Sequence, residues 1–217
     1  MSKRGKMGKS NKTSRYSVHP GVAMVQDSVA TLKEKSGRTL EEWIALTRKS
    51  GPKDEKGRRE WLKKEHGLGT NSAWWIAERA GGKPSVDDDP QAYLEAAEDY
   101  VEKMFEGGKT GLKPVYEALL DLAFSLGPDV KACPCKTIVP LYRKHVFAQI
   151  KPSTRTRIDL GLALAATAAP KRLIDTGGFA KKDRITHRIE IGRVEDIDAE
   201  VKKWLKIAYE KDVVGSQ

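Results

Sequence analysis

The N-terminal part of the chain carries apolar side chains at helical spacing. This spacing predicts helices over four segments, residues 22–34, 40–50, 55–66 and 72–80. Thr39, with Glu42 three residues later, has the pattern of a capping box at the start of the second helix. Four of the five tryptophans lie between Trp43 and Trp75. We expect them to anchor a small helical module, which has few other bulky residues to build a core.

A polar segment with two glycines and three consecutive aspartates, residues 81–89, is typical of a linker. Two further helices are predicted after it, over residues 91–106 and 113–126. The period then changes to two, which predicts short strands over residues 137–142, 145–150, 156–160 and 185–191. A closing helix is predicted over residues 195–211.

This order of elements predicts an α+β protein, with a small N-terminal helical module and a C-terminal domain in which helices pack on an antiparallel meander sheet. We expect four parts: a disordered basic tail at 1–21, the helical module at 22–80, the linker at 81–89 and the α+β domain at 90–217.

The net charge of +10 is unevenly distributed along the chain. Residues 1–18 hold six Lys or Arg and no acid, and residues 131–193 hold fourteen basic and four acidic residues. Residues 83–130 hold four basic and eleven acidic residues. Two interpretations stay open. The basic segments could attract phosphate-bearing partners, or they could pair with the acidic helices of the same chain.

Several classes of protein are disfavoured. No stretch of 18 apolar residues is present, and no apolar segment follows the basic N-terminus, so we expect neither a membrane span nor a secretory signal. The two cysteines, Cys133 and Cys135, are too close for an unstrained disulfide and too few for a zinc site, which favours reduced thiols in a cytoplasmic protein. The four histidines show no metal-ligand spacing, and we expect no metal and no cofactor.

The predicted strands carry the main candidates for a binding surface. Basic residues alternate there with aromatic residues, as on surfaces that bind nucleic acid by phosphate attraction and base stacking. The basic candidates are Lys136, Arg143, Lys151, Arg155 and Arg157, and the aromatic candidates among them are Tyr142 and Phe147. The same alternation is also what any half-buried strand shows.

A second hypothesis places a pocket for a small anion or metabolite in the C-terminal domain. His187 shares a predicted strand face with three isoleucines and has arginines nearby. It could contact a ligand in a pocket bordered by Lys136, Phe147, Arg157 and Phe179. The alternative is a histidine at the core edge whose ring is hydrogen-bonded internally.

Two short glycine-containing motifs are weaker indicators of function. Gly107-Gly108-Lys109-Thr110 resembles the end of a phosphate loop, but the first glycine of that motif is replaced by Lys103 and a helix precedes it. We therefore do not expect a nucleotide loop. The Gly67-Leu68-Gly69 turn before a predicted helix could expose amides to a DNA phosphate or could be an ordinary helix connection.

Two stretches resemble known families. Ser36-Gly-Arg-Thr-Leu-Glu-Glu-Trp-Ile44 and His66-Gly-Leu-Gly-Thr-Asn-Ser-Ala73, within residues 28–80, resemble domain-of-unknown-function family 4287. Phe147-Ala-Gln-Ile150, Arg157-Ile-Asp-Leu-Gly-Leu162 and Thr186-His-Arg188, within residues 112–210, resemble domain-of-unknown-function family 5655. The resemblance implies a bacterial chain with the two domains in this order and carries over no activity.

The sequence favours a non-enzymatic binding protein, because no paired acids or activated nucleophile suggest catalysis. DNA or RNA is the favoured partner, through the basic tail and the basic sheet face, and a small anionic ligand is the alternative. The sequence does not indicate an oligomeric state or a role for the cysteines.

Overall fold

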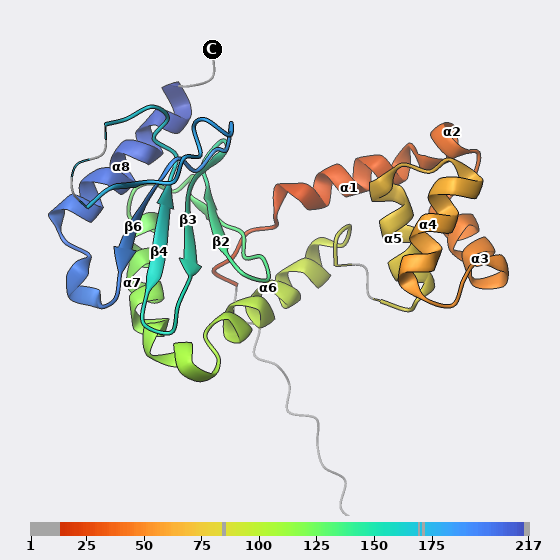
Figure 1. The fold of residues 1–217 in the computed structure, drawn as a ribbon, viewed down its shortest axis with the longest axis horizontal. Coiled ribbons are helices and arrows are strands. Elements are labelled where there is room, and N and C mark those ends of the chain that lie inside the picture. Colours follow the sequence, from red (N-terminus) through yellow and green to blue (C-terminus); the bar gives the residue numbers. More distant parts are fainter. Residues whose placement is uncertain (1–13, 84–85, 169, 171, 215–217) are drawn as a thin grey trace, which may run out of the picture. The chain divides into compact units, whose positions relative to one another are not determined.

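The computed structural model describes residues 14–83, 86–168, 170 and 172–214. They form two compact units, one of residues Val18–Ala96 and the other of the segment ending at Ser17 together with Ala97–Gln217. The helices of the first unit are α1 (Pro20–Ala30), α2 (Leu32–Ser36), α3 (Leu40–Ser50), α4 (Glu55–His66) and α5 (Thr70–Ala80), labelled in Figure 1.

The helical unit has its core between α3, α4 and α5. Trp43 and Leu62 are buried there, and the ring of His66 lies against Trp43 and Trp61 at centroid distances of 5.2 and 4.4 Å. The capping box forms, since the Glu42 amide donates to Thr39 Oγ1 at 3.2 Å and the Thr39 amide donates to the Glu42 carboxylate at 2.7 Å. Trp43 and Trp61 thus anchor the module as the sequence predicts, whereas Trp74 is exposed.

Two helix ends of this unit have local causes. The predicted helix over 22–34 is interrupted at Thr31, whose hydroxyl donates to the Asp27 carbonyl and competes with the helical pattern. At the end of α4, Gly67 has φ +64°, a left-handed conformation that favours glycine, and Leu68 then enters the core. The Gly67-Leu68-Gly69 turn is therefore a packed connection between α4 and α5.

The aspartates of the predicted linker have structural roles within the helical unit. Asp88 pairs with the buried Arg79 at 2.8 Å, and its carbonyl accepts from the Gln26 side chain at 2.8 Å. Asp89 caps α6 (Pro90–Met104) by accepting from the Gln91 amide at 2.9 Å. The two compact units divide inside α6, after Ala96, whereas the prediction placed a linker at residues 81–89.

The C-terminal unit is an α+β domain, as predicted. Besides the end of α6, its helices are η1 (Gly107–Leu112), α7 (Lys113–Phe124), η2 (Val194–Asp196) and α8 (Ala199–Val214). Its strands are β1 (Lys131–Ala132), β2 (Val139–Tyr142), β3 (Val146–Pro152), β4 (Ile158–Leu162), β5 (Ile174–Asp175) and β6 (His187–Ile191). The short strands β1 and β5 were not predicted, because two residues are too few to show alternation.

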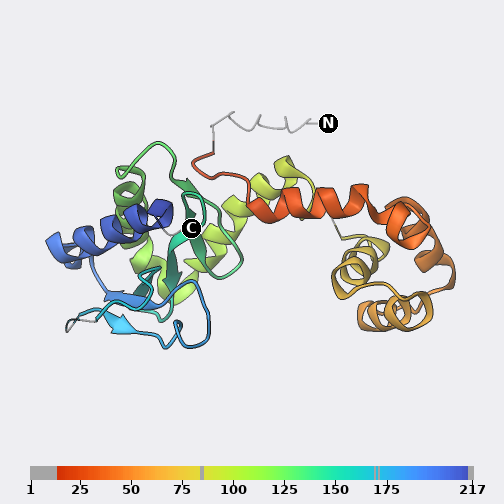
Figure 2. The same ribbon diagram turned by 90° about the horizontal axis from the view of Figure 1, so that it is seen from above.

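The sheet is antiparallel throughout, in the order β1-β2-β3-β4-β6-β5. The register places Val139, Ile150, Leu160 and Ile189 in one row, and all four are fully buried. Figures 1 and 2 show α7 and α8 together on one side of the sheet. The opposite face carries Lys151, Asp159 and Glu190 in a second row. The domain therefore has two layers and one open sheet face.

A bulge disturbs the alternation between β2 and β3. The register passes from Leu141 opposite Ala148 to Tyr142 opposite Val146 and skips Phe147. Phe147 and Ala148 are consequently both buried, and the Phe147 ring lies 5.6 Å from that of Tyr209 on α8.

The tail predicted over residues 1–21 requires a correction. Residues 1–13 lie outside the described part of the chain, but residues 14–17 are held on the C-terminal unit. Arg15 pairs with Glu117 at 2.6 Å and with Asp121, and the Ser17 amide donates to the Ala132 carbonyl at 2.9 Å. Tyr16 packs on the domain core, and its hydroxyl lies 3.0 Å from that of Tyr116. One aromatic anchor and two acids of α7 thus fix this segment, and Pro20 already begins α1.

The contact between the Tyr16 and Tyr116 hydroxyls predicts that the stability losses of two substitutions are not additive. Tyr16→Phe leaves the buried Tyr116 hydroxyl without this partner and should lower the free energy of unfolding by about 1–3 kcal/mol. In the double variant Tyr16→Phe/Tyr116→Phe no hydroxyl is left buried at this contact, so the loss should be smaller than the sum of the two single losses. Urea denaturation measures all four proteins. A Tyr16→Phe variant as stable as the unsubstituted protein would show that the segment is not anchored.

Candidate anion-binding site

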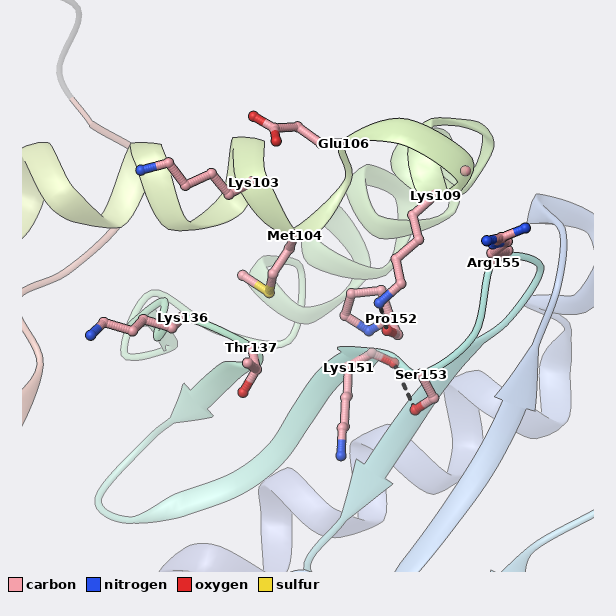
Figure 3. Close-up of a pocket in the computed structure, with 11 residues that line it drawn as sticks. Lys103, Met104, Glu106, Lys109, Lys136, Thr137, Lys151, Pro152, Ser153 and Arg155 are labelled. Carbon is pink, nitrogen blue, oxygen red and sulfur yellow. Dashed lines mark hydrogen bonds between the residues drawn. The ribbon is translucent and has the colours of Figure 1, made fainter.

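A cleft lined mainly by basic side chains lies at one end of the sheet in the C-terminal unit. Its volume is about 520 Å³, within the range of ligand sites. Figure 3 shows side chains from the end of α6, from η1, from the segment before β2 and from the β3–β4 hairpin. We call it the basic cleft. Five cationic side chains and one carboxylate, that of Glu106, line it: Lys103, Lys109, Lys136, Lys151 and Arg155.

The cations of the basic cleft are largely uncompensated. Within the described residues, Lys136, Lys151 and Arg155 form no ion pair, and Lys103 approaches only the exposed Asp99, at 3.8 Å. Lys109 Nζ donates to the Pro152 carbonyl at 2.6 Å. In Figure 3 the carboxylate of Glu106 points away from the strands. The lining therefore carries an excess of positive charge.

The cations are also spread along the cleft. Figure 3 places Lys103 and Lys136 toward one end and Arg155 at the other, with Lys109 and Lys151 between them. An extended row of charges matches a chain of phosphates better than one compact anion. Met104 and Pro152 supply apolar surface, and the hydroxyl of Thr137 could donate to a phosphate oxygen, whereas that of Ser153 already donates to Asp159.

The position of Arg155 follows from the hairpin between β3 and β4. The Arg157 carbonyl accepts from the amides of Ser153 at 3.1 Å and Thr154 at 3.2 Å, which closes a tight turn with Arg155 at its tip. The Arg155 side chain runs over Gly108, where a Cβ would lie 3.0 Å from its Cδ. A glycine at position 108 leaves room for this approach.

Arg157, predicted to belong to the same basic surface, lies instead in an ion-pair network on the open sheet face. Asp159 pairs with Arg157 at 3.0 Å and with Arg188 at 2.7 Å, and it accepts from Ser153 Oγ at 2.7 Å. Glu190 pairs with the same two arginines at 3.0 and 3.2 Å. Two carboxylates thus neutralise two guanidinium groups here, and this part of the sheet has no excess of charge.

Arg143 is likewise compensated. Its Nε donates to the Asp129 carboxylate at 2.6 Å, and its guanidinium lies 4.0 Å from the centre of the Tyr209 ring. The hydrogen bond from Arg143 and one from the Tyr209 hydroxyl lower the pKa of Asp129. The structure therefore brings Lys136, Lys151 and Arg155 together and separates Arg143 and Arg157 from them.

The aromatic candidates lie outside the basic cleft. Phe147 is in the core because of the bulge, and Phe179 is 59% exposed on the loop before β6. Tyr142 is half-buried beside Cys133 and Cys135, and burial raises its pKa to about 12. An aromatic stacking surface combined with the basic residues is therefore not formed by the described residues.

His187 is buried, and both ring nitrogens have neighbours. Nδ1 lies 2.9 Å from Thr186 Oγ1, and Nε2 lies 2.9 Å from the Thr167 carbonyl oxygen. Its imidazole is thus used within the domain, as in the internally hydrogen-bonded alternative.

Two cleft residues, Lys103 and Lys109, were not among the predicted site residues. They lie on α6 and η1, before the strands in sequence, and only the fold brings them to the hairpin. A partial signal was available in Gly107-Gly108-Lys109-Thr110, which resembles a phosphate loop. The segment forms a 3₁₀ helix that positions Lys109 at the cleft.

Two absences concern only the described part of the chain. No cluster of three or more His, Cys, Asp or Glu side chains with a metal-site arrangement is found there. None of its helices combines the length and the apolar character needed to cross a bilayer.

The comparison with family models assigns the C-terminal part of the chain. A model described as Domain of unknown function (DUF5655) matches residues 101–212, more than half of the chain. The protein belongs to this family. All five cations of the basic cleft lie within the DUF5655 match.

A second model, Domain of unknown function (DUF4287), matches residues 25–80, which correspond to most of the helical unit. Both resemblances and their order along the chain are confirmed. No curated protein and no solved structure matches the chain.

The Asp159 network in the DUF5655 domain predicts unequal effects of two isosteric substitutions. Asp159 is 13% exposed and Glu190 is 37% exposed. Asp159→Asn removes charge-assisted bonds in a partly buried setting and should lower the free energy of unfolding by about 1–3 kcal/mol. Glu190→Gln, the matched control, should cost less than about 1 kcal/mol, because its pairs are better solvated. Equal effects in urea denaturation would contradict the account of the network.

The cysteines of the DUF5655 domain predict a labelling pattern. Burial raises the pKa of the Cys133 thiol to about 12, and it also raises that of Cys135. Near pH 8 the folded protein should react with iodoacetamide much more slowly than the unfolded protein, and Cys133 should react more slowly than the partly exposed Cys135. Mass spectrometry of timed samples measures both rates. Rapid labelling of Cys133 in the folded protein would refute this prediction.

Proposed function

We propose that this protein is a non-enzymatic binding protein whose basic cleft binds the phosphate backbone of nucleic acid. One observation carries the proposal: five cationic side chains are spread along a single cleft, and four of them, all but Lys103, have no ion-pair partner among the described residues. Lysine side chains act as compact point charges and suit phosphate groups without demanding a fixed geometry.

The composition of the cleft favours binding that does not depend on base sequence. None of the described residues that line it is aromatic, so base stacking would contribute little. The residues best placed to act are four lysines, one arginine and the hydroxyl of Thr137, all suited to phosphate oxygens. We therefore expect DNA and RNA of different sequence to bind with similar affinity.

The N-terminal segment adds to this proposal through its charge. Five Lys or Arg residues precede Ser14 in the sequence, and residues 14–17 are attached to the same unit as the cleft. Cations tethered to the domain would raise the local attraction for a polyanion and speed its association.

A small phosphorylated ligand is a second candidate for the same cleft, because its volume is that of a metabolite site. The shared chemistry is the phosphate group, and length dependence separates the two candidates. A nucleic-acid site should gain affinity as an oligonucleotide lengthens from about 4 to about 20 nucleotides, since more phosphates are contacted. A metabolite site should bind ATP as tightly as the longest oligonucleotide.

If the cleft binds phosphates, two triple variants that each lose three positive charges should differ in their affinity for an oligonucleotide. Lys136→Gln/Lys151→Gln/Arg155→Gln removes three cleft charges and should weaken binding of a fluorescein-labelled oligothymidylate by about tenfold or more. The control Lys202→Gln/Lys203→Gln/Lys206→Gln removes three exposed charges from α8 of the same unit and should weaken it by less than about threefold. Fluorescence anisotropy at fixed salt measures both.

Three results would count against the proposal. Equal weakening by the two triple variants would mean that only the net charge matters. A failure of the unsubstituted protein to bind at micromolar concentration would remove the nucleic-acid proposal. A strong preference for one base sequence would contradict recognition of the backbone alone.

A further inference from the structure

A second cavity in the DUF5655 domain is separate from the basic cleft, since the two have no described lining residue in common. Its volume is about 830 Å³. It lies between the segment after β4, the loop before β6 and the last turns of α8. We call it the Phe179 pocket, after the aromatic side chain among its lining residues. Nothing in the proposed nucleic-acid function uses it.

One wall of the Phe179 pocket is organised by Asp212, whose side chain is fully buried. Its carboxylate accepts from the amides of Lys144 and His145, each at 2.8 Å, and it pairs with Arg184. Arg184 also donates to the Val146 carbonyl at 2.9 Å. A buried carboxylate is stable only with such partners. These bonds join three separate segments, so the wall is fixed before any ligand arrives.

The loop before β6 is fixed by backbone bonds. The Gly178 carbonyl accepts from the amides of Lys181 at 3.0 Å and Asp183 at 2.8 Å. A Cβ at Gly178 would lie 2.3 Å from the Ile185 carbonyl oxygen, so only glycine fits there. Phe179 follows directly and is thereby held at the surface.

Backbone strain is concentrated at this pocket. Among the described residues, Ala165 and Lys182 are the non-glycine residues with positive φ, at 54° and 59°. Both line the Phe179 pocket. A non-glycine residue in this conformation is retained when the surroundings require it, and such residues cluster at ligand sites.

The lining combines apolar surface with a small excess of positive charge. Four alanines and the ring of Phe179 supply the apolar part. Because Phe179 is 59% exposed, its burial contributes little to the stability of the fold, and an exposed aromatic side chain of this kind is typical of a binding site. Arg184 compensates Asp212, which leaves Lys182 and Lys211 against Asp183. Lys211 is held in place by the Leu164 carbonyl at 3.1 Å and Thr167 Oγ1 at 3.0 Å.

We propose that the Phe179 pocket binds a small organic monoacid with a flat apolar body. The apolar body would lie between the Phe179 ring and the alanine wall, and its single negative charge would lie near Lys182 and Lys211. A ligand of this class matches both the apolar area and the residual charge of the pocket.

The test uses 1-naphthoate as a probe and 1-naphthalenemethanol as its neutral analogue, titrated into the ¹⁵N-labelled full-length protein. Amide shifts should be confined to residues 163–165, 179–186 and 208–212, and naphthoate should bind about fivefold or more tightly than the alcohol. Phe179→Ser should weaken naphthoate binding about fivefold. Val194→Ser, which alters another exposed apolar residue outside the pocket, should leave binding unchanged.

Lys182→Gly separates the backbone strain at this residue from the role of its ammonium group in binding. Glycine accepts positive φ, so the variant should have a higher Tm than the unsubstituted protein, while naphthoate binding weakens through loss of the ammonium group. A lower Tm, or unchanged affinity, would contradict the role given to Lys182.

Either of two results overturns the proposal as a whole: no amide shift at millimolar naphthoate, or shifts outside the three segments that persist in Phe179→Ser. Amide shifts found only at the basic cleft would also overturn the monoacid proposal, but they would leave the nucleic-acid proposal unaffected. The two proposals can therefore fail independently.

Discussion

The pairing of Asp159 with Arg157 and Arg188 determines where the DUF5655 domain carries free positive charge. The aspartate lies on the open sheet face in one row with Lys151 and Glu190, and it accepts a hydrogen bond from Ser153 in the β3–β4 hairpin. The same carboxylate thus neutralises two arginines of the sheet and fixes the base of the turn that carries Arg155. Charge is removed from the middle of the sheet and remains at its end, in the basic cleft.

Because of this arrangement, the position of the cleft indicates where an anion would bind better than the total charge of the chain does. The net charge of +10 indicates that the chain attracts anions, but it does not indicate where on the chain they would bind. Arg143 and Arg157 have partners at 2.6 and 3.0 Å, so a phosphate would have to compete with an existing carboxylate there. Lys136, Lys151 and Arg155 form no ion pair among the described residues. A polyanion would therefore gain most at the cleft.

The sequence predicts the helices and most strands well, because their signals are local. Apolar spacing, the Thr39–Glu42 capping box and the Ile158–Leu160 alternation each act within a few residues. The site was predicted only in part, because its decisive contacts span the chain. Strand alternation shows that Arg157 points away from the core, but the pairing of β4 with β6 brings Glu190 to it. The burial of Phe147 depends on a bulge that alternation does not reveal.

Cations with a carboxylate partner should take little part in phosphate binding, and the salt dependence of oligonucleotide binding tests this most directly. The logarithm of the association constant should fall linearly with the logarithm of salt concentration. Lys151→Gln should reduce the magnitude of that slope by about 1, because one phosphate contact is lost. Arg157→Gln removes the same charge from the ion-pair network and should leave the slope unchanged. An equal reduction by both substitutions would contradict the account.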